Sequence, residues 1–91
     1  MDRLDAMQLY VAVVDAHSFA RAAEVLGQPR STVSRVVKEL EAWLGAQLLQ
    51  RTTRKLSVTA EGRRYYEECK RLLAEMAAME ASFPGHSAQP A

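Results

Sequence analysis

The most restrictive feature of this sequence is a pair of short helical segments joined by a glycine turn. The first segment, residues 19–26, follows Ser18, a residue type that is favoured as a helix N-cap. Gly27 suits the left-handed position that commonly ends a helix. Pro29 suits the first turn of a second helix, at about 30–44, because the missing N–H of proline is not needed there. These signals predict two helices that pack against each other across a tight turn.

The spacing of small and apolar residues across this turn is typical of a helix-turn-helix. Ala23 is small where the two helix axes approach, and Val33 and Val36 close the far side of the turn. From Ala23 through Gly27 to the two valines the steps are 4, 6 and 3 residues. The alternative is an ordinary α-hairpin in a helical bundle. We favour the helix-turn-helix because each of these residues also agrees with the helical period.

The remaining segments predict a mainly α fold. Residues 3–16 form an apolar helical pattern, and residues 47–51 and 55–58 are two short runs that predict a β-hairpin. The expected architecture is a winged helix-turn-helix (three helices plus a two-stranded β wing), followed by a long dimerisation or linker helix. The expected boundaries are 1–59 for the winged helix-turn-helix, 60–83 for the linker/dimerisation helix and 84–91 for a flexible tail.

The last predicted helix carries a heptad pattern of apolar residues. From Tyr65 to Phe83 these residues follow steps of 4, 3, 4, 3 and 4. A helix of about 24 residues is ~36 Å long, more than the rest of the fold can cover. We therefore expect it to pair with a second copy of the chain, and the alternative is that it folds back as ordinary core. The residues expected at the dimer interface are Tyr65, Cys69, Leu72, Met76 and Met79.

Charge is unevenly distributed along the chain, although the net charge is only +1. Residues 27–64 hold eight Lys and Arg against three Glu, a net charge of +5, and the other residues together carry −4. This segregation indicates a polyanionic partner for the middle of the chain. On charge alone, a solvated basic face explains the pattern equally well.

The second helix of the pair presents hydroxyls and cations on the face opposite an apolar stripe. This valine stripe, which we expect to be buried with Val36 and Trp43 beside it, consists of Val33, Val37, Leu40 and Leu44. Ser31, Ser34, Arg35 and Lys38 lie at positions i, i+3, i+4 and i+7, and Arg30 and Thr32 flank them. A helix in a DNA major groove needs short hydroxyl side chains near the backbone and arginine for the N7 and O6 atoms of guanine. This face is therefore our candidate for contact with double-stranded DNA.

Two other segments extend the candidate DNA-binding surface. Ser18 and Arg21, in the first turn of the preceding helix, suit a phosphate group. The predicted hairpin tip has three cations and two hydroxyls without an acid, which suits the phosphate backbone and a narrow minor groove; the alternative is a solvated basic turn. The expected DNA-binding residues are Ser18, Arg21, Arg30, Ser31, Thr32, Ser34, Arg35, Lys38, Arg51, Thr53, Arg54 and Lys55.

Other classes of function find little support. A single cysteine, Cys69, excludes an internal disulfide and a multi-cysteine zinc site, and indicates a reducing cytoplasm. Its place on the apolar heptad favours packing over a nucleophilic or redox role. We expect no enzyme, cofactor or metal site, because the two histidines are far apart and there is no glycine-rich phosphate loop. No run of residues is apolar enough for a membrane span. A winged helix used only for protein contact would leave Arg35 and the wing cations unexplained.

Three linked motifs resemble the N-terminal domain of LysR-type transcriptional regulators. They are A-R-A-A-E-V-L-G, S-T-V-S-R-V-V-K-E-L-E-x-x-L-G and L-L-Q-R-T-T-R-K-L-S-V-T-A-E-G, in that order, and the resemblance covers residues 1–82. It implies a bacterial regulator that binds a pseudo-palindromic operator as a homodimer, with the 30–44 helix in the major groove, the hairpin as the wing and the last helix pairing two domains.

The sequence departs from that family pattern in two respects. Gln28-Pro29-Arg30 stands where family members usually have a serine cap, which predicts a weaker cap for the helix at 30–44. The effector-binding domain that family members normally carry is absent from these 91 residues. A small-molecule effector is therefore expected only if such a domain exists in a longer protein.

Overall fold

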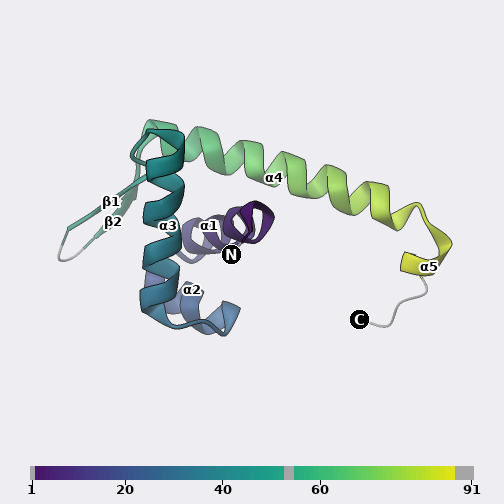
Figure 1. Ribbon diagram of the computed structural model, residues 1–91, viewed down its shortest axis with the longest axis horizontal. Helices are drawn as coiled ribbons and strands as arrows, with labels where there is room; N and C mark the ends of the chain where they lie inside the picture. The colour runs from purple at the N-terminus through teal and green to yellow at the C-terminus, as the bar shows by residue number, and fades with distance from the viewer. Residues whose placement is uncertain (1, 53–54, 88–91) are drawn as a thin grey trace.

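Three helices and a two-stranded wing enclose one core, and a fourth helix extends away from it (Figure 1). The computed structural model describes residues 2–52 and 55–87. The elements in chain order are α1 (Arg3–Ala16), α2 (Phe19–Leu26), α3 (Arg30–Leu44), β1 (Leu49–Arg51), β2 (Leu56–Val58), α4 (Ala60–Ala81) and α5 (Pro84–Ser87). The mainly α winged helix-turn-helix with a long following helix, predicted from the sequence, is confirmed.

Side-chain caps determine where three of the helices begin. The side chains of Asp2, Ser18 and Thr59 accept hydrogen bonds from backbone N–H groups three residues later, at 2.8, 3.1 and 2.9 Å. α3 begins after Pro29 without a side-chain cap, as its sequence predicts. Gly27 ends α2 with a φ of 65°, which a residue with a Cβ rarely adopts.

The core lies where α1, α2 and α3 meet the wing. α1 contributes its apolar face, α2 its small residues, and α3 the predicted valine stripe. The buried residues of this core are Ala6, Leu9, Tyr10, Val13, Phe19, Ala22, Ala23, Val33, Val36, Val37, Leu40, Leu48, Leu49 and Leu56. Because the valines of α3 are buried, the opposite face of that helix is the one left to solvent.

Glu41 ties α3 to the start of the wing. Its carboxylate oxygen Oε2 accepts hydrogen bonds from the backbone N–H groups of Leu48, at 2.8 Å, and Leu49, at 3.1 Å. Hydrogen bonds to an ionised carboxylate are stronger than those between neutral groups. β1 then pairs with β2 in an antiparallel register, with Arg51 opposite Leu56. The orientation of the wing relative to α3 is therefore set at its base.

A close approach of backbones joins α1, the wing and α4. The Tyr10 hydroxyl donates a buried 2.8 Å hydrogen bond to the carbonyl oxygen of Gly62. The carbonyl oxygen of Leu48 accepts hydrogen bonds from the backbone N–H and the side-chain hydroxyl of Thr59. A Cβ added at Gly62 would lie 2.0 Å from that same Leu48 oxygen. Only glycine allows α4 to start this close to the wing.

Some surface details differ from the sequence-based expectation. Trp43, expected beside the buried stripe of α3, is 59% exposed, and the Arg3 guanidinium lies 3.2 Å from the centroid of its ring. Leu4 is 38% exposed, although it continues the apolar stripe of α1. Pro84–Ser87 form the short helix α5, in a segment for which the sequence predicts a flexible tail; residues 88–91 of that tail lie outside the described residues.

Two tyrosines at the contact of α1 with α4 predict a loss of stability at high pH. The Tyr10 and Tyr65 rings are 5.4 Å apart, and burial is the main cause that raises both pKa values above the ordinary 10.0, that of Tyr65 to about 12. Because both phenols ionise more readily in the unfolded chain, their contribution is complete below pH 10 and is lost as the pH rises through the raised pKa values.

We expect the thermal unfolding midpoint to fall as the pH is raised from 10 to 12, and to fall less in Tyr65→Phe, which has no phenol to ionise at this position. Thermal melts of both proteins over that range, followed by circular dichroism, provide the measurement. The same decline in the two proteins would contradict a role for Tyr65.

Candidate nucleic-acid interface

The exposed side of α3 carries the residues that the sequence singles out. We call Ser31, Ser34, Arg35 and Lys38 the recognition face. Ser31, Arg35 and Lys38 are exposed and Ser34 is half-buried, while Val33, Val36 and Val37 on the other side are buried. At the start of the helix Arg30 is exposed and Thr32 is half-buried. The fold therefore presents one row of hydroxyls and cations to solvent.

Arg35, the central cation of the recognition face, is paired within its own helix. Its Nη1 lies 2.9 Å from Glu39 Oε2, one turn further along α3. The two side chains are 58% and 61% exposed, so solvent screens this ion pair and its contribution to stability is small. A DNA group can therefore replace Glu39 as the partner of Arg35 at little energetic cost.

Arg51 makes contacts that sequence reasoning missed. From the end of β1, its Nη2 donates a 3.0 Å hydrogen bond to Ser34 Oγ on α3, and its guanidinium carbon lies 4.3 Å from the centroid of the Phe19 ring. The basic composition of the hairpin indicates a cation there, but not which helix it meets, because that contact joins residues 17 positions apart. The wing and the recognition face are thus in direct contact.

The other predicted contact residues that the structure describes belong to the start of α2 and to the wing. Arg21 and Lys55 are exposed. The Ser18 hydroxyl, expected to help hold a phosphate, already accepts the hydrogen bond from the backbone N–H of Arg21 that caps α2. At the wing, the backbone N–H of Thr52 donates a 2.9 Å hydrogen bond to the carbonyl of Lys55. Thr53 and Arg54 lie outside the described residues.

The heptad residues at the end of the chain divide into two that are packed within the single chain and others that are at least partly exposed to solvent. We call Tyr65, Cys69, Leu72, Met76, Met79 and Phe83 the seam. Cys69 has an exposed fraction of 0% within a single chain, and Tyr65 packs against the core and the Tyr10 ring. Cys69, which the sequence predicts at a dimer interface, has no exposed surface in this structure, so the exposed residues of the seam carry that prediction. Tyr65 is half-buried, and its buried surface packs against its own domain.

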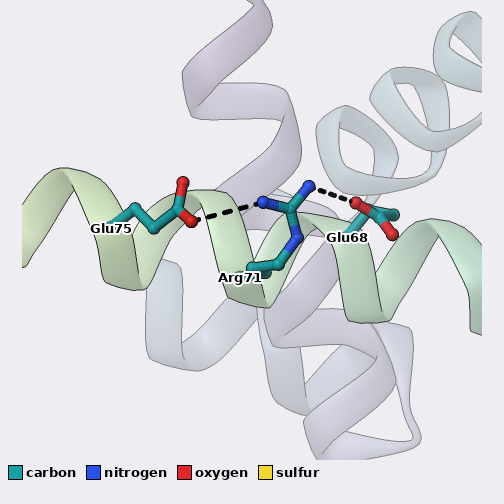
Figure 2. A network of polar contacts seen from close by, with 3 residues as sticks. All are labelled: Glu68, Arg71 and Glu75. Carbon is teal, nitrogen blue, oxygen red and sulfur yellow. Dashed lines mark hydrogen bonds and ion pairs between the residues drawn. The ribbon is translucent and has the colours of Figure 1, made fainter.

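The outer part of the seam is left open to solvent. Leu72, Met79 and Phe83 are 46%, 54% and 60% exposed, and Met76 is half-buried. On another side of α4, the Arg71 guanidinium lies between Glu68, at 2.6 Å, and Glu75, at 3.3 Å (Figure 2). The hydrogen bond from Arg71 lowers the pKa of Glu68. Such ion pairs one turn apart favour the helical state where α4 has left the core.

The structure supports packing as the role of Cys69. Burial raises the pKa of its thiol, which keeps it protonated and unreactive near neutral pH. Over residues 2–52 and 55–87, no three His, Cys, Asp or Glu side chains gather in a way that suits a metal ion. Within the same residues, no helix combines the length and the apolar character needed to cross a membrane.

The chain is similar to known bacterial regulators. The family model of the bacterial regulatory helix-turn-helix proteins of the lysR family matches residues 4–63. An HTH-type transcriptional repressor of Pseudomonas aeruginosa (strain UCBPP-PA14) is 49% identical over 90 residues, which are 99% of this chain and 28% of that protein. The HTH-type transcriptional regulator CrgA of Neisseria meningitidis (serogroup B, strain MC58) is 53% identical over 74 residues, 81% of this chain and 25% of the relative. The chain thus spans about a quarter of the length of these relatives, which are named regulators and not enzymes.

Solved structures are also similar to this chain. The BenM DBD in its complex with catB site 1 DNA matches with a TM-score of 0.86 and 32% identity, over 100% of both chains. CrgA from Neisseria meningitidis, a LysR-type transcriptional regulator, matches with a TM-score of 0.71 and 50% identity, over 86% of this chain and 26% of that one. The matched family model covers the helix-turn-helix, the wing and the start of α4, the same elements that carry the exposed cations described above. This chain belongs to the LysR family of bacterial regulatory helix-turn-helix proteins.

Proposed function

We propose that this chain binds double-stranded DNA sequence-specifically as a homodimer and thereby regulates bacterial transcription. In this proposal α3 enters the major groove, the wing residues 51–55 follow the phosphate backbone and the minor groove, and α4 pairs two copies. The observation that carries the proposal is the recognition face, with Arg35 and Lys38 exposed on it and Arg51 of the wing bonded to its Ser34. Hydroxyls and guanidinium groups in this arrangement suit base edges and phosphates together.

The DNA-bound BenM DBD supports this proposal, because the structures match over the full length of both chains. The wing cations support it as well, since Arg51 and Lys55 are exposed and Arg51 contacts the recognition face. A winged helix used only to bind another protein would need no row of cations there. Sequence-specific binding of DNA decides between the two functions.

The exposed part of the seam supports pairing through α4. Leu72 and Met79 present apolar surface on a helix that has left its own core, and Phe83 adds to it just after the end of α4. Two domains related by a two-fold axis would place two recognition helices on one face of a duplex, about 34 Å or one turn apart. The target would then be a pseudo-palindromic operator, with one half-site for each copy.

Substitutions of Arg35 and Lys55, which are expected to contact different parts of the DNA, test the proposed function. We expect Arg35→Ala to lose about 1–3 kcal/mol of discrimination between preferred and unrelated duplexes, because a guanine contact would be lost. We expect Lys55→Ala to weaken all duplexes alike and to reduce the slope of log K against log salt by roughly 1, because one phosphate contact would be lost.

Fluorescence anisotropy with duplexes selected from random DNA, at several salt concentrations, measures both quantities. Glu39→Gln is the matched control for Arg35→Ala, because it removes the ion pair of Arg35 and leaves the guanidinium in place. This control should keep the discrimination of the wild type. If Arg35→Ala and Lys55→Ala reduced binding to every duplex in the same proportion, the division between base and phosphate contacts would be wrong.

A further inference from the structure

Arg51 lies across both helices of the helix-turn-helix. Its planar guanidinium is placed over the Phe19 ring of α2, and Nη2 donates to Ser34 Oγ on α3. Phe19 is 6% exposed and belongs to the core, so it is a fixed support for the guanidinium. A planar cation stacked on a fixed ring retains less freedom to turn than a lysine ammonium would. The Arg51–Ser34 contact is therefore held in one geometry.

That contact determines how Ser34 can bond to anything else. Arginine carries only donors, so Ser34 Oγ must accept in this hydrogen bond, and its own proton is left to point elsewhere. Among the described residues, the Ser34 hydroxyl donates no hydrogen bond, and it lies at the middle of the recognition face. A serine hydroxyl has one donor and two acceptor sites, and Arg51 occupies one of the two acceptor sites, so the single proton of Ser34 is directed away from Arg51.

The surroundings of Ser34 also favour an acceptor as its partner. Ser34 lies at the edge of a hollow of about 230 Å³ between α3 and β1, which Lys38 and Arg51 also line. Glu41 lines the same hollow, but its Oε2 already accepts two backbone hydrogen bonds. A group that enters the hollow therefore meets two cations and one hydroxyl proton against one carboxylate, a net positive lining that favours an electron-rich atom.

We propose that Arg51 is a positioning residue for DNA recognition, which orients the Ser34 hydroxyl so that it donates its proton to an acceptor atom of the DNA. This inference rests on the proposed function. The acceptor is a purine N7, guanine O6 or thymine O4 on a base edge, or an oxygen of the phosphodiester backbone. The amino groups of adenine and cytosine are disfavoured as partners of Ser34, because they are donors and Lys38 and Arg51 line the same hollow.

A double-mutant cycle in DNA affinity tests the coupling. We expect Ser34→Ala to weaken binding about 3- to 10-fold on the duplex that the wild-type chain prefers, the effect of one hydrogen bond. In an Arg51→Met background, which keeps an unbranched side chain over Phe19 but has no donor, Ser34→Ala should cause no further loss. The two losses should therefore not add.

Lys55→Met is the matched control, because it also removes one wing cation. In that background Ser34→Ala should still weaken DNA binding by the full factor of about 3 to 10, the effect of one hydrogen bond. Arg51→Lys restores a side chain that can donate to Ser34. In that background Ser34→Ala should again weaken binding, although by less than in the wild type. The thermal unfolding midpoint of every variant identifies any that fails to fold, and Ser34→Ala together with Lys55→Met leaves the Phe19–Arg51 stack untouched.

Chemically altered DNA identifies the acceptor. Base analogues that each lack one acceptor atom, and methylphosphonates at single backbone positions, should reveal one position that matters to the wild type and not to Ser34→Ala. A base analogue at that position places the acceptor on a base edge, and a methylphosphonate places it on the backbone. If no position showed this dependence on Ser34, the inference would be overturned.

Failure of this inference is distinguishable from failure of the proposed function. If Ser34→Ala caused the same fold loss with and without Arg51 on a bound duplex, the positioning role alone would be overturned. If the wild-type chain showed no sequence preference for any duplex, the proposed function would fail, and the positioning role with it.

Discussion

Gly62→Ala is expected to destabilise the domain by about 3 kcal/mol or more, at the upper end of what overpacking costs. The added Cβ would lie 2.0 Å from the carbonyl oxygen and 2.8 Å from the carbonyl carbon of Leu48. Both are backbone atoms, and Glu41 and Thr59 hold that stretch of backbone in place. The Cβ would also meet the Tyr10 hydroxyl at 2.8 Å, and this group donates to the Gly62 carbonyl. No neighbour can move without breaking a buried hydrogen bond.

The sign of this effect is itself diagnostic. In an unconstrained helix, replacing glycine by alanine stabilises by about 1 kcal/mol. For a domain of this size, the expected loss lowers the unfolding midpoint by roughly 12 °C or more, measured by circular dichroism. Gly85→Ala is the matched control, because an added Cβ there meets nothing within 4 Å, and its midpoint should not change. A stable Gly62→Ala variant would show that α4 can begin further from the wing.

The double substitution Leu72→Glu with Met76→Glu is expected to turn the proposed dimer into monomers and to weaken DNA binding by about 100-fold or more. Leu72 is exposed and Met76 half-buried on the outer part of the seam, and each new carboxylate would have to be buried in a paired state at a large desolvation cost. Two linked domains bind two half-sites about 10²–10⁴ times more tightly than one domain binds alone. Sedimentation measures the first effect and anisotropy on the preferred duplex the second.

A control on the same helix separates the interface from the charge. Ala74→Glu with Ala78→Glu introduces two carboxylates with the same spacing on the opposite side of α4, where both alanines are exposed. This variant should remain dimeric and should lose affinity only by the small effect of two added negative charges. If Leu72→Glu with Met76→Glu sedimented as a dimer, the interface would lie elsewhere on the chain.

The sequence was sufficient for the elements and for the side of α3 that carries the cations. Caps at Asp2, Ser18 and Thr59 and the glycine at position 27 act within one helical turn, so their effect can be read locally. The valine stripe of α3 follows the helical period, and burying it leaves the recognition face exposed on the other side. Local signals of this kind involve residues only a few positions apart.

Only the tertiary structure decided what depends on contacts between distant residues. A heptad pattern records apolar positions but not their partners, so Cys69 and Leu72 look alike in the sequence although one is buried in its own fold and the other is exposed. Arg51 meets Ser34 across 17 positions, and Tyr10 meets Gly62 across 52. Trp43 is exposed under the Arg3 guanidinium, a contact between residues 40 positions apart that the helical period does not reveal. The period of a sequence determines which side of a helix is apolar, whereas the packing of the whole chain determines what that side touches.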